Sequence, residues 1–116
     1  MPVPPPLLPL LLLPACGPSR DAFFERLAHV VCATWFECEP DYAEGHWSDE
    51  GDCEDEYAEA VDDLKAAYAD CAYDRGAGGD CIQAHRDLGC DPTGAETDAL
   101  LDTCEHVWDC GEETGG

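Results

Sequence analysis

The sequence predicts an all-α fold: a small, disulfide-stapled bundle of about four helices. Two observations lead to this fold class. Apolar residues recur at spacings of three and four along four separate segments, as they do on one face of an amphipathic helix. Nine cysteines in 116 residues are more than a reducing compartment usually tolerates, and small secreted domains use such a density to reinforce a small core. We therefore expect the cysteines to be oxidised and the protein to be exported.

The first two helices are predicted from their apolar stripes. Residues 21–37 and 53–73 each place their apolar side chains on a single helical face. Asp52 stands where the second helix needs an N-cap, and acidic residues crowd the turn that follows, where the helix dipole favours them. Between the two helices, residues 39–51 contain Pro40, glycines and many acids without periodicity, so we expect an acidic loop there.

Two shorter helices are predicted at residues 80–88 and 94–109. A glycine-rich turn, residues 76–79, precedes the first of them. The second follows a capping box in which the Thr93 hydroxyl and the Glu96 carboxylate each satisfy a backbone N–H. These boundaries complete a single helical domain.

The N-terminal residues 1–15 are expected to be a signal peptide of the lipoprotein type. Their apolar run is about seven residues long, whereas a membrane-spanning helix needs about twenty. The run ends in LPAC at residues 13–16, which resembles the lipobox of bacterial lipoprotein signal peptides. That resemblance implies an acylated Cys16 as the first mature residue. A plain secretory signal that releases a soluble protein is the alternative. The expected order is then lipidated Cys16 and a short tether at residues 16–20, the helical domain at 21–111 and a flexible tail at 112–116.

The cysteine count agrees with lipid on Cys16, because an even number then remains for disulfides. A helix rises 1.5 Å per residue, so two cysteines of one predicted helix lie too far apart for the roughly 7 Å limit of a disulfide. The pairs Cys53–Cys71, Cys81–Cys90 and Cys104–Cys110 are therefore disfavoured by distance, and we expect the bridges to join different elements. If the first two helices are antiparallel, Cys38–Cys53 is the best single pair. The eight cysteines are Cys32, Cys38, Cys53, Cys71, Cys81, Cys90, Cys104 and Cys110.

The charge of the chain excludes one class of partner. Twenty-seven acidic residues against five basic ones give a formal net charge of −22. Such a chain repels the phosphate backbone of nucleic acids and also anionic lipid headgroups. We therefore expect no nucleic-acid partner.

No catalytic constellation is recognisable, and no cofactor or firm metal site is predicted. The only two serines, Ser19 and Ser48, lie in the tether and in the acidic loop, away from any motif that would activate a nucleophile. Paired zinc ligands at C-x₂-C spacing are absent, and oxidation of the cysteines would remove such ligands. A cluster of acids supplies weak calcium candidates, although its spacing does not fit an EF-hand loop. These candidates are Asp49, Glu50, Asp52, Asp55 and Glu56.

Aromatic and histidine residues are assigned by their position in the pattern. Trp35 and Trp108 fall on helical stripes and are expected in the core, and His85 is expected to be half-buried. Trp47 lies beside His46 in the acidic loop, where an exposed aromatic ring would indicate a contact surface.

Three features together resemble the uncharacterised cysteine-rich small lipoproteins of myxobacteria and related deltaproteobacteria. They are the proline- and leucine-rich leader ending at Cys16, the segment CATWFEC at residues 32–38, and the short helix closed by Cys81 and Cys90. The resemblance implies an outer-membrane or periplasm-facing address, a helical disulfide-bonded fold and no established activity. We expect a monomeric, non-enzymatic interaction or structural module whose acyl chains on Cys16 insert into the bilayer. The alternatives are a calcium-responsive or small-ligand binding module, and a secreted small enzyme or enzyme inhibitor.

Overall fold

Five helices and one pair of short strands form the part of the chain that the computed structural model describes, residues 17–111. The helical fold class and the disulfide bonding predicted from the sequence are confirmed. The predicted signal peptide (1–15), Cys16 and the predicted tail (112–116) lie outside the described residues.

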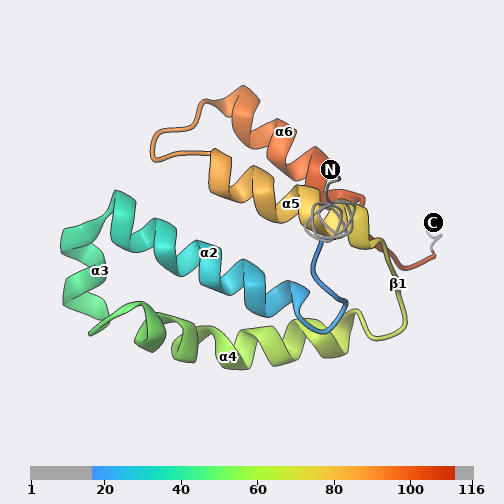
Figure 1. Ribbon diagram of the computed structural model, residues 1–116, viewed down its shortest axis with the longest axis horizontal. Coiled ribbons are helices and arrows are strands. Elements are labelled where there is room, and N and C mark those ends of the chain that lie inside the picture. The colour runs from blue at the N-terminus through green and yellow to red at the C-terminus, as the bar shows by residue number, and fades with distance from the viewer. Residues whose placement is uncertain (1–16, 112–116) are drawn as a thin grey trace, which may run out of the picture.

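The helices are arranged as two antiparallel hairpins that pack on each other (Figure 1). In the first hairpin α2 (Phe23–Cys38) lies beside α4 (Glu50–Ala67), and α3 (Pro40–His46) forms the connection between them. In the second, α5 (Arg75–Asp87) pairs with α6 (Gly94–Glu105). Because α2 also packs against α5, it is the helix that joins the two hairpins.

The strands β1 (Ala72–Tyr73) and β2 (Trp108–Asp109) pair in antiparallel register beside the second hairpin. The Asp74 N–H donates to the Val107 carbonyl at 2.9 Å, and the Cys71–Cys110 disulfide closes the other end of the pair. Both segments were predicted to be helical, up to residues 73 and 109, and those two predicted helix ends are wrong. Pairing with a distant strand replaces the helical hydrogen bonds there.

Helix α4 begins three residues earlier and ends six residues earlier than predicted. Its N-cap is Asp49, whose carboxylate accepts from the Asp52 N–H, while the Asp52 carboxylate accepts from the Ser48 N–H. After Ala67 the chain turns, and the Arg20 guanidinium donates to the carbonyls of Tyr68 and Ala69 at 2.9 and 2.8 Å. The Tyr68 carbonyl also accepts from the Cys71 N–H at 3.0 Å, so this turn is held by a backbone hydrogen bond and by the Arg20 side chain.

Helix α5 begins at Arg75, so the predicted glycine-rich turn at 76–79 is helical. Asp74 caps this helix by accepting from the Ala77 N–H at 2.9 Å. Here glycine serves close packing: a Cβ on Gly78 would clash with the Tyr73 hydroxyl. At α6 the capping box of Thr93 and Glu96 is confirmed, with both of its hydrogen bonds present.

The acidic segment 39–51 is not the predicted loop, because Pro40–His46 forms α3. Proline at the first helical position suits a helix start, since its ring fixes φ and its missing N–H needs no partner. Within this short helix only Ala43 is buried. A single buried position creates no apolar stripe, and the helix therefore gave no periodic signal.

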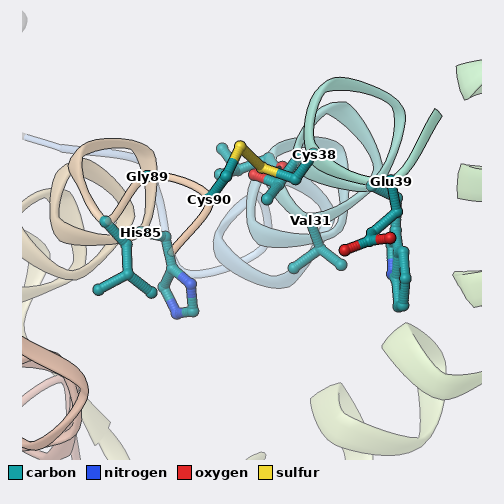
Figure 2. A pocket seen from close by; sticks show the side chains of 10 residues that line it. Val31, Cys38, Glu39, His85, Gly89 and Cys90 are labelled. Carbon is teal, nitrogen blue, oxygen red and sulfur yellow. Dashed lines mark hydrogen bonds between the residues drawn. A yellow bond between two sulfur atoms is a disulfide. The ribbon is translucent and has the colours of Figure 1, made fainter. Parts of the chain in front are cut away.

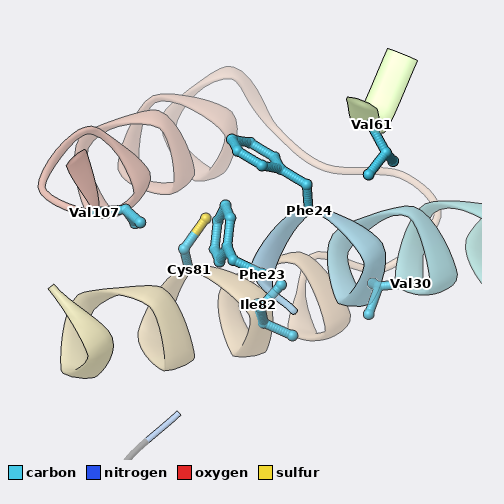
Figure 3. Packing of buried hydrophobic residues seen from close by; sticks show 7 residues of the cluster. All are labelled: Phe23, Phe24, Val30, Val61, Cys81, Ile82 and Val107. Carbon is cyan, nitrogen blue, oxygen red and sulfur yellow. The ribbon is translucent and has the colours of Figure 1, made fainter. Parts of the chain in front are cut away.

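The apolar interior consists of two separate clusters. The larger one joins α2, α4, α5 and the segment before β2 (Figure 3), and Trp108 packs against it. The smaller cluster lies between α2, α3 and α4 around the Cys32–Cys53 disulfide and includes Trp47, with Trp35 packed against it. Trp35 and Trp108 therefore pack against the core as predicted, although Trp108 lies on β2. The buried members of the larger cluster are Phe23, Phe24, Val30, Val61, Cys81, Ile82 and Val107.

All eight cysteines of the described domain form disulfides, and each bond joins different elements. The predicted pair Cys38–Cys53 is wrong. Cys32 and Cys38 stand six residues apart on α2, so at 3.6 residues per turn they point to different sides of the helix. Cys32 meets α4, and Cys38 reaches the loop between α5 and α6. The observed pairs are Cys32–Cys53, Cys38–Cys90, Cys71–Cys110 and Cys81–Cys104.

Candidate functional site

The residues that follow Cys16 are docked onto the domain. Pro18 is buried, and its carbonyl accepts from the Tyr73 hydroxyl at 2.6 Å. The Gly17 carbonyl accepts from Arg75 Nε at 3.0 Å. Gly17 has a φ of +75°, and a Cβ there would clash with the backbone of Arg75 and Gly79. The tether predicted at residues 16–20 is thus, from Gly17 onward, part of the folded domain.

This docking fixes where the chain leaves the domain toward Cys16. Consecutive Cα atoms are about 3.8 Å apart, so Cys16 is within one peptide unit of the docked Gly17. Arg20 adds to the attachment, because its guanidinium lies 5.1 Å from the centre of the Trp108 ring in addition to its two hydrogen bonds to backbone carbonyls. Any group carried by Cys16 would therefore stand next to the surface formed by the segment 17–20 and α5.

A cavity of about 310 Å³ lies between the C-terminal halves of α2 and α5, beside the Cys38–Cys90 disulfide (Figure 2). Its walls are mainly apolar and include Val31 and Leu88, and its polar groups include His85 and Glu39. His85 is half-buried, as the sequence predicted. The volume is at the lower end of the range for pockets that hold small ligands.

Burial lowers the pKa of His85 below its ordinary value of 6.5. The unfolded chain then binds a proton more readily than the folded chain, so His85 takes stability away as the pH falls through 6.5 toward the folded pKa. We expect the free energy of unfolding of the wild type, relative to His85→Gln, to decrease between about pH 7 and about pH 5. Urea unfolding of both proteins measures this difference. Carboxylates common to both proteins cancel in it, and a difference that does not change with pH would contradict the prediction.

The structure brings Cys81, His85 and Cys104 together, with their ligand atoms within 4.8 Å of one another. The two sulfur atoms are bonded to each other, so neither offers the thiolate that zinc requires. Sequence spacing did not reveal this trio, because Cys104 comes from a different helix. In residues 17–111 it is the one group of three such side chains close enough to hold a metal ion.

The weak calcium candidates do not converge on one point. Asp49 and Asp52 are used in capping α4, and Glu56 accepts a hydrogen bond from the Trp47 indole. Glu50 and Asp55 are exposed to solvent. Their concentration at the start of α4 is explained by capping and by the helix dipole.

The predicted contact surface at His46 and Trp47 is wrong for the tryptophan. Trp47 is only 6% exposed, because its ring fills the smaller core cluster. His46 is exposed and stacks on Tyr42, with ring centres 5.4 Å apart, and Tyr42 is 51% exposed. The exposed aromatic ring of α3 is therefore Tyr42.

Comparison with known proteins gives no family assignment. A scan against protein-family models found no match, and searches of curated proteins and of solved structures found none. Over residues 17–111, the structure contains no helix with both the length and the apolar character needed to cross a membrane.

Proposed function

We propose that this chain is an exported bacterial lipoprotein, anchored in the membrane by acyl chains on Cys16, whose acidic helical domain acts as a non-enzymatic interaction or structural module. The proposal concerns an envelope protein of the outer membrane or periplasm. The arrangement of its cysteines is the main support.

One observation carries the proposal: the four disulfides use eight of the nine cysteines and leave Cys16 over. Cys16 ends the lipobox-like LPAC sequence at residues 13–16 and directly precedes the docked segment. An exported protein that keeps a spare thiol carries a reactive group, whereas acylation uses that thiol. Position and pairing thus favour the same role for Cys16.

The dependence on disulfides favours export independently of Cys16. The buried interior is divided into two clusters, and the smaller one has a disulfide at its centre, with Cys32 and Cys53 both 0% exposed. Disulfides of this kind form and persist in oxidising compartments such as the periplasm.

The geometry also suggests how such a module would be presented. Helix α3 lies at the opposite end of α2 from the docked segment (Figure 1). The sixteen residues of α2 span about 24 Å at 1.5 Å per residue. With Cys16 in the membrane, the exposed pair Tyr42 and His46 would stand away from the anchor, available to a partner.

Intact mass spectrometry of the protein purified from the membranes of a Gram-negative host tests the proposal. We expect loss of residues 1–15 and added acyl mass on Cys16. Reduction should add about eight hydrogens, two for each disulfide. Cys16→Ser is the control and should appear without acyl mass, still carrying four disulfides. A wild-type chain recovered with an unmodified Cys16 thiol would overturn the membrane anchor, and eight thiols in the native protein would overturn export.

A further inference from the structure

Three of the few basic side chains gather in one groove. The chain has five basic residues among 116, and four of them are arginines. A groove of about 660 Å³ between the docked segment and α5 is lined by Arg26 of α2 and by Arg75 and Arg86 of α5. Arg26 is distant in sequence from the other two, and the packing of α2 against α5 brings it to the same groove. We call this depression the arginine groove.

The arginine groove is free of acidic side chains in a chain that has 27 of them. Among residues 17–111, none of its three guanidinium groups has a carboxylate within 4 Å, whereas Lys65 pairs with Glu25 at 2.8 Å. An adjoining depression is also lined by Arg26 and Arg86 and contains Glu25. The Glu25 carboxylate forms its ion pair with Lys65 and not with either arginine. The groove therefore presents unpaired positive charge on a molecule whose net charge is strongly negative.

One wall of the arginine groove is the docked segment itself, Gly17, Pro18 and Ser19. The groove therefore begins within one peptide unit of Cys16. Guanidinium groups bind phosphate well, because their paired N–H donors match two phosphate oxygens and their charge is permanent. A phosphate-rich surface next to Cys16 is the occupant that this combination of charge and position fits.

We propose that the arginine groove binds the phosphate groups of membrane lipid headgroups in the leaflet that holds the acyl chains of Cys16. This inference rests on the membrane anchor proposed above. It gives the domain a fixed orientation, with the groove against the headgroups. It also supplies a second membrane contact beside the acyl chains, and a protein that carries only one alkyl chain makes this contact measurable, because a single chain holds a protein only weakly and reversibly.

The test uses the full chain with Cys16 alkylated by a maleimide that carries one saturated alkyl chain, so that it does not depend on acylation in a cell. Binding is measured by flotation with vesicles of phosphatidylcholine and phosphatidylglycerol, and with vesicles of galactolipid that lack phosphate. Removing an arginine near an anionic surface should weaken binding about fivefold. We therefore expect Arg26→Gln/Arg86→Gln to bind phospholipid vesicles more than about tenfold more weakly, with no change on galactolipid.

Lys65→Gln is the matched control for Arg86→Gln, because each removes one positive charge from the surface. Lys65→Gln should stay within about twofold of the parent protein on phospholipid vesicles. Arg26 and Arg86 are exposed and make no side-chain hydrogen bond with the described residues, so their loss should leave the fold intact, as four disulfides in the intact mass would verify. Equal effects of Arg86→Gln and Lys65→Gln, or an equal loss on galactolipid, would overturn the groove. If the intact mass of the protein from cells showed no acyl group on Cys16, that result would overturn the membrane anchor but not the binding of phosphate by the groove.

Discussion

Replacing Cys38 and Cys90 together by alanine should lower the free energy of unfolding by about 4 kcal/mol. This disulfide closes a loop of 52 residues, the longest of the four. In the chain-entropy description, the bond stabilises the fold by restricting the unfolded chain, and the effect grows with loop length. It is also the bond that joins the end of the first hairpin to the loop of the second. The expected loss corresponds to a fall in the melting temperature of about 15 to 30 °C, measurable by circular dichroism.

Leu88→Ala is the control for this experiment. Leu88 lines the cavity beside the Cys38–Cys90 bond but cross-links nothing. Because it is only partly buried, its truncation should cost about 1 to 2 kcal/mol. A double cysteine variant that loses no more stability than Leu88→Ala would show that side-chain packing, and not the cross-link, holds the two hairpins together.

The sequence predicts a helix correctly where one face of that helix meets the core. The prediction is wrong where a segment is held by few buried residues or by pairing with a distant strand. The stripe of α2 locates that helix to within two residues of its observed bounds. Helix α3 has one buried residue, Ala43, and therefore no stripe, although Pro40 at its first position was a usable signal. The ends of α4 and α6 depend on strands β1 and β2, which are separated by residues 74–107 and leave no local pattern.

The cysteine partners show the same limit. Distances along a helix excluded three pairs, and the structure contains none of them. Choosing the true partners requires the direction in which each cysteine faces and the placement of the second hairpin. The hypothesis Cys38–Cys53 took α2 and α4 as antiparallel, which is correct, but it ignored that Cys32 and not Cys38 faces α4.

The candidate sites were predictable to different degrees. The lipobox-like sequence at Cys16 is a local motif, so the sequence located the proposed anchor directly. The arginine groove joins residues from α2 and from both ends of α5, and a net charge of −22 conceals it. That net charge led to an expectation of repulsion from anionic lipids, whereas the distribution of charge places the arginines together beside Cys16.

Phe23→Ala should cost about 3 to 5 kcal/mol, the largest loss expected from one substitution in this domain. Phe23 is 3% exposed, begins α2 and lies in the larger cluster among residues of both hairpins (Figure 3). Its ring centre lies 5.1 Å from that of Phe24, 5.9 Å from Tyr73 and 6.0 Å from Trp108. Truncation would leave a cavity between α2, β1 and β2. The Cys71–Cys110 disulfide joins the two strand segments and limits how far they can move to fill it.

Urea unfolding of the oxidised protein measures the loss at Phe23, and Tyr42→Ala is its control. Tyr42 is also aromatic but 51% exposed on α3, so its removal should cost no more than about 1 kcal/mol. The comparison separates the packing of the larger cluster from the covalent bonds, because both variants keep all four disulfides. If Phe23→Ala lost no more stability than Tyr42→Ala, the disulfides alone would be holding the fold and the apolar cluster would contribute little. We expect the opposite, since a cross-link restricts the unfolded chain but does not replace the free energy of a buried aromatic ring.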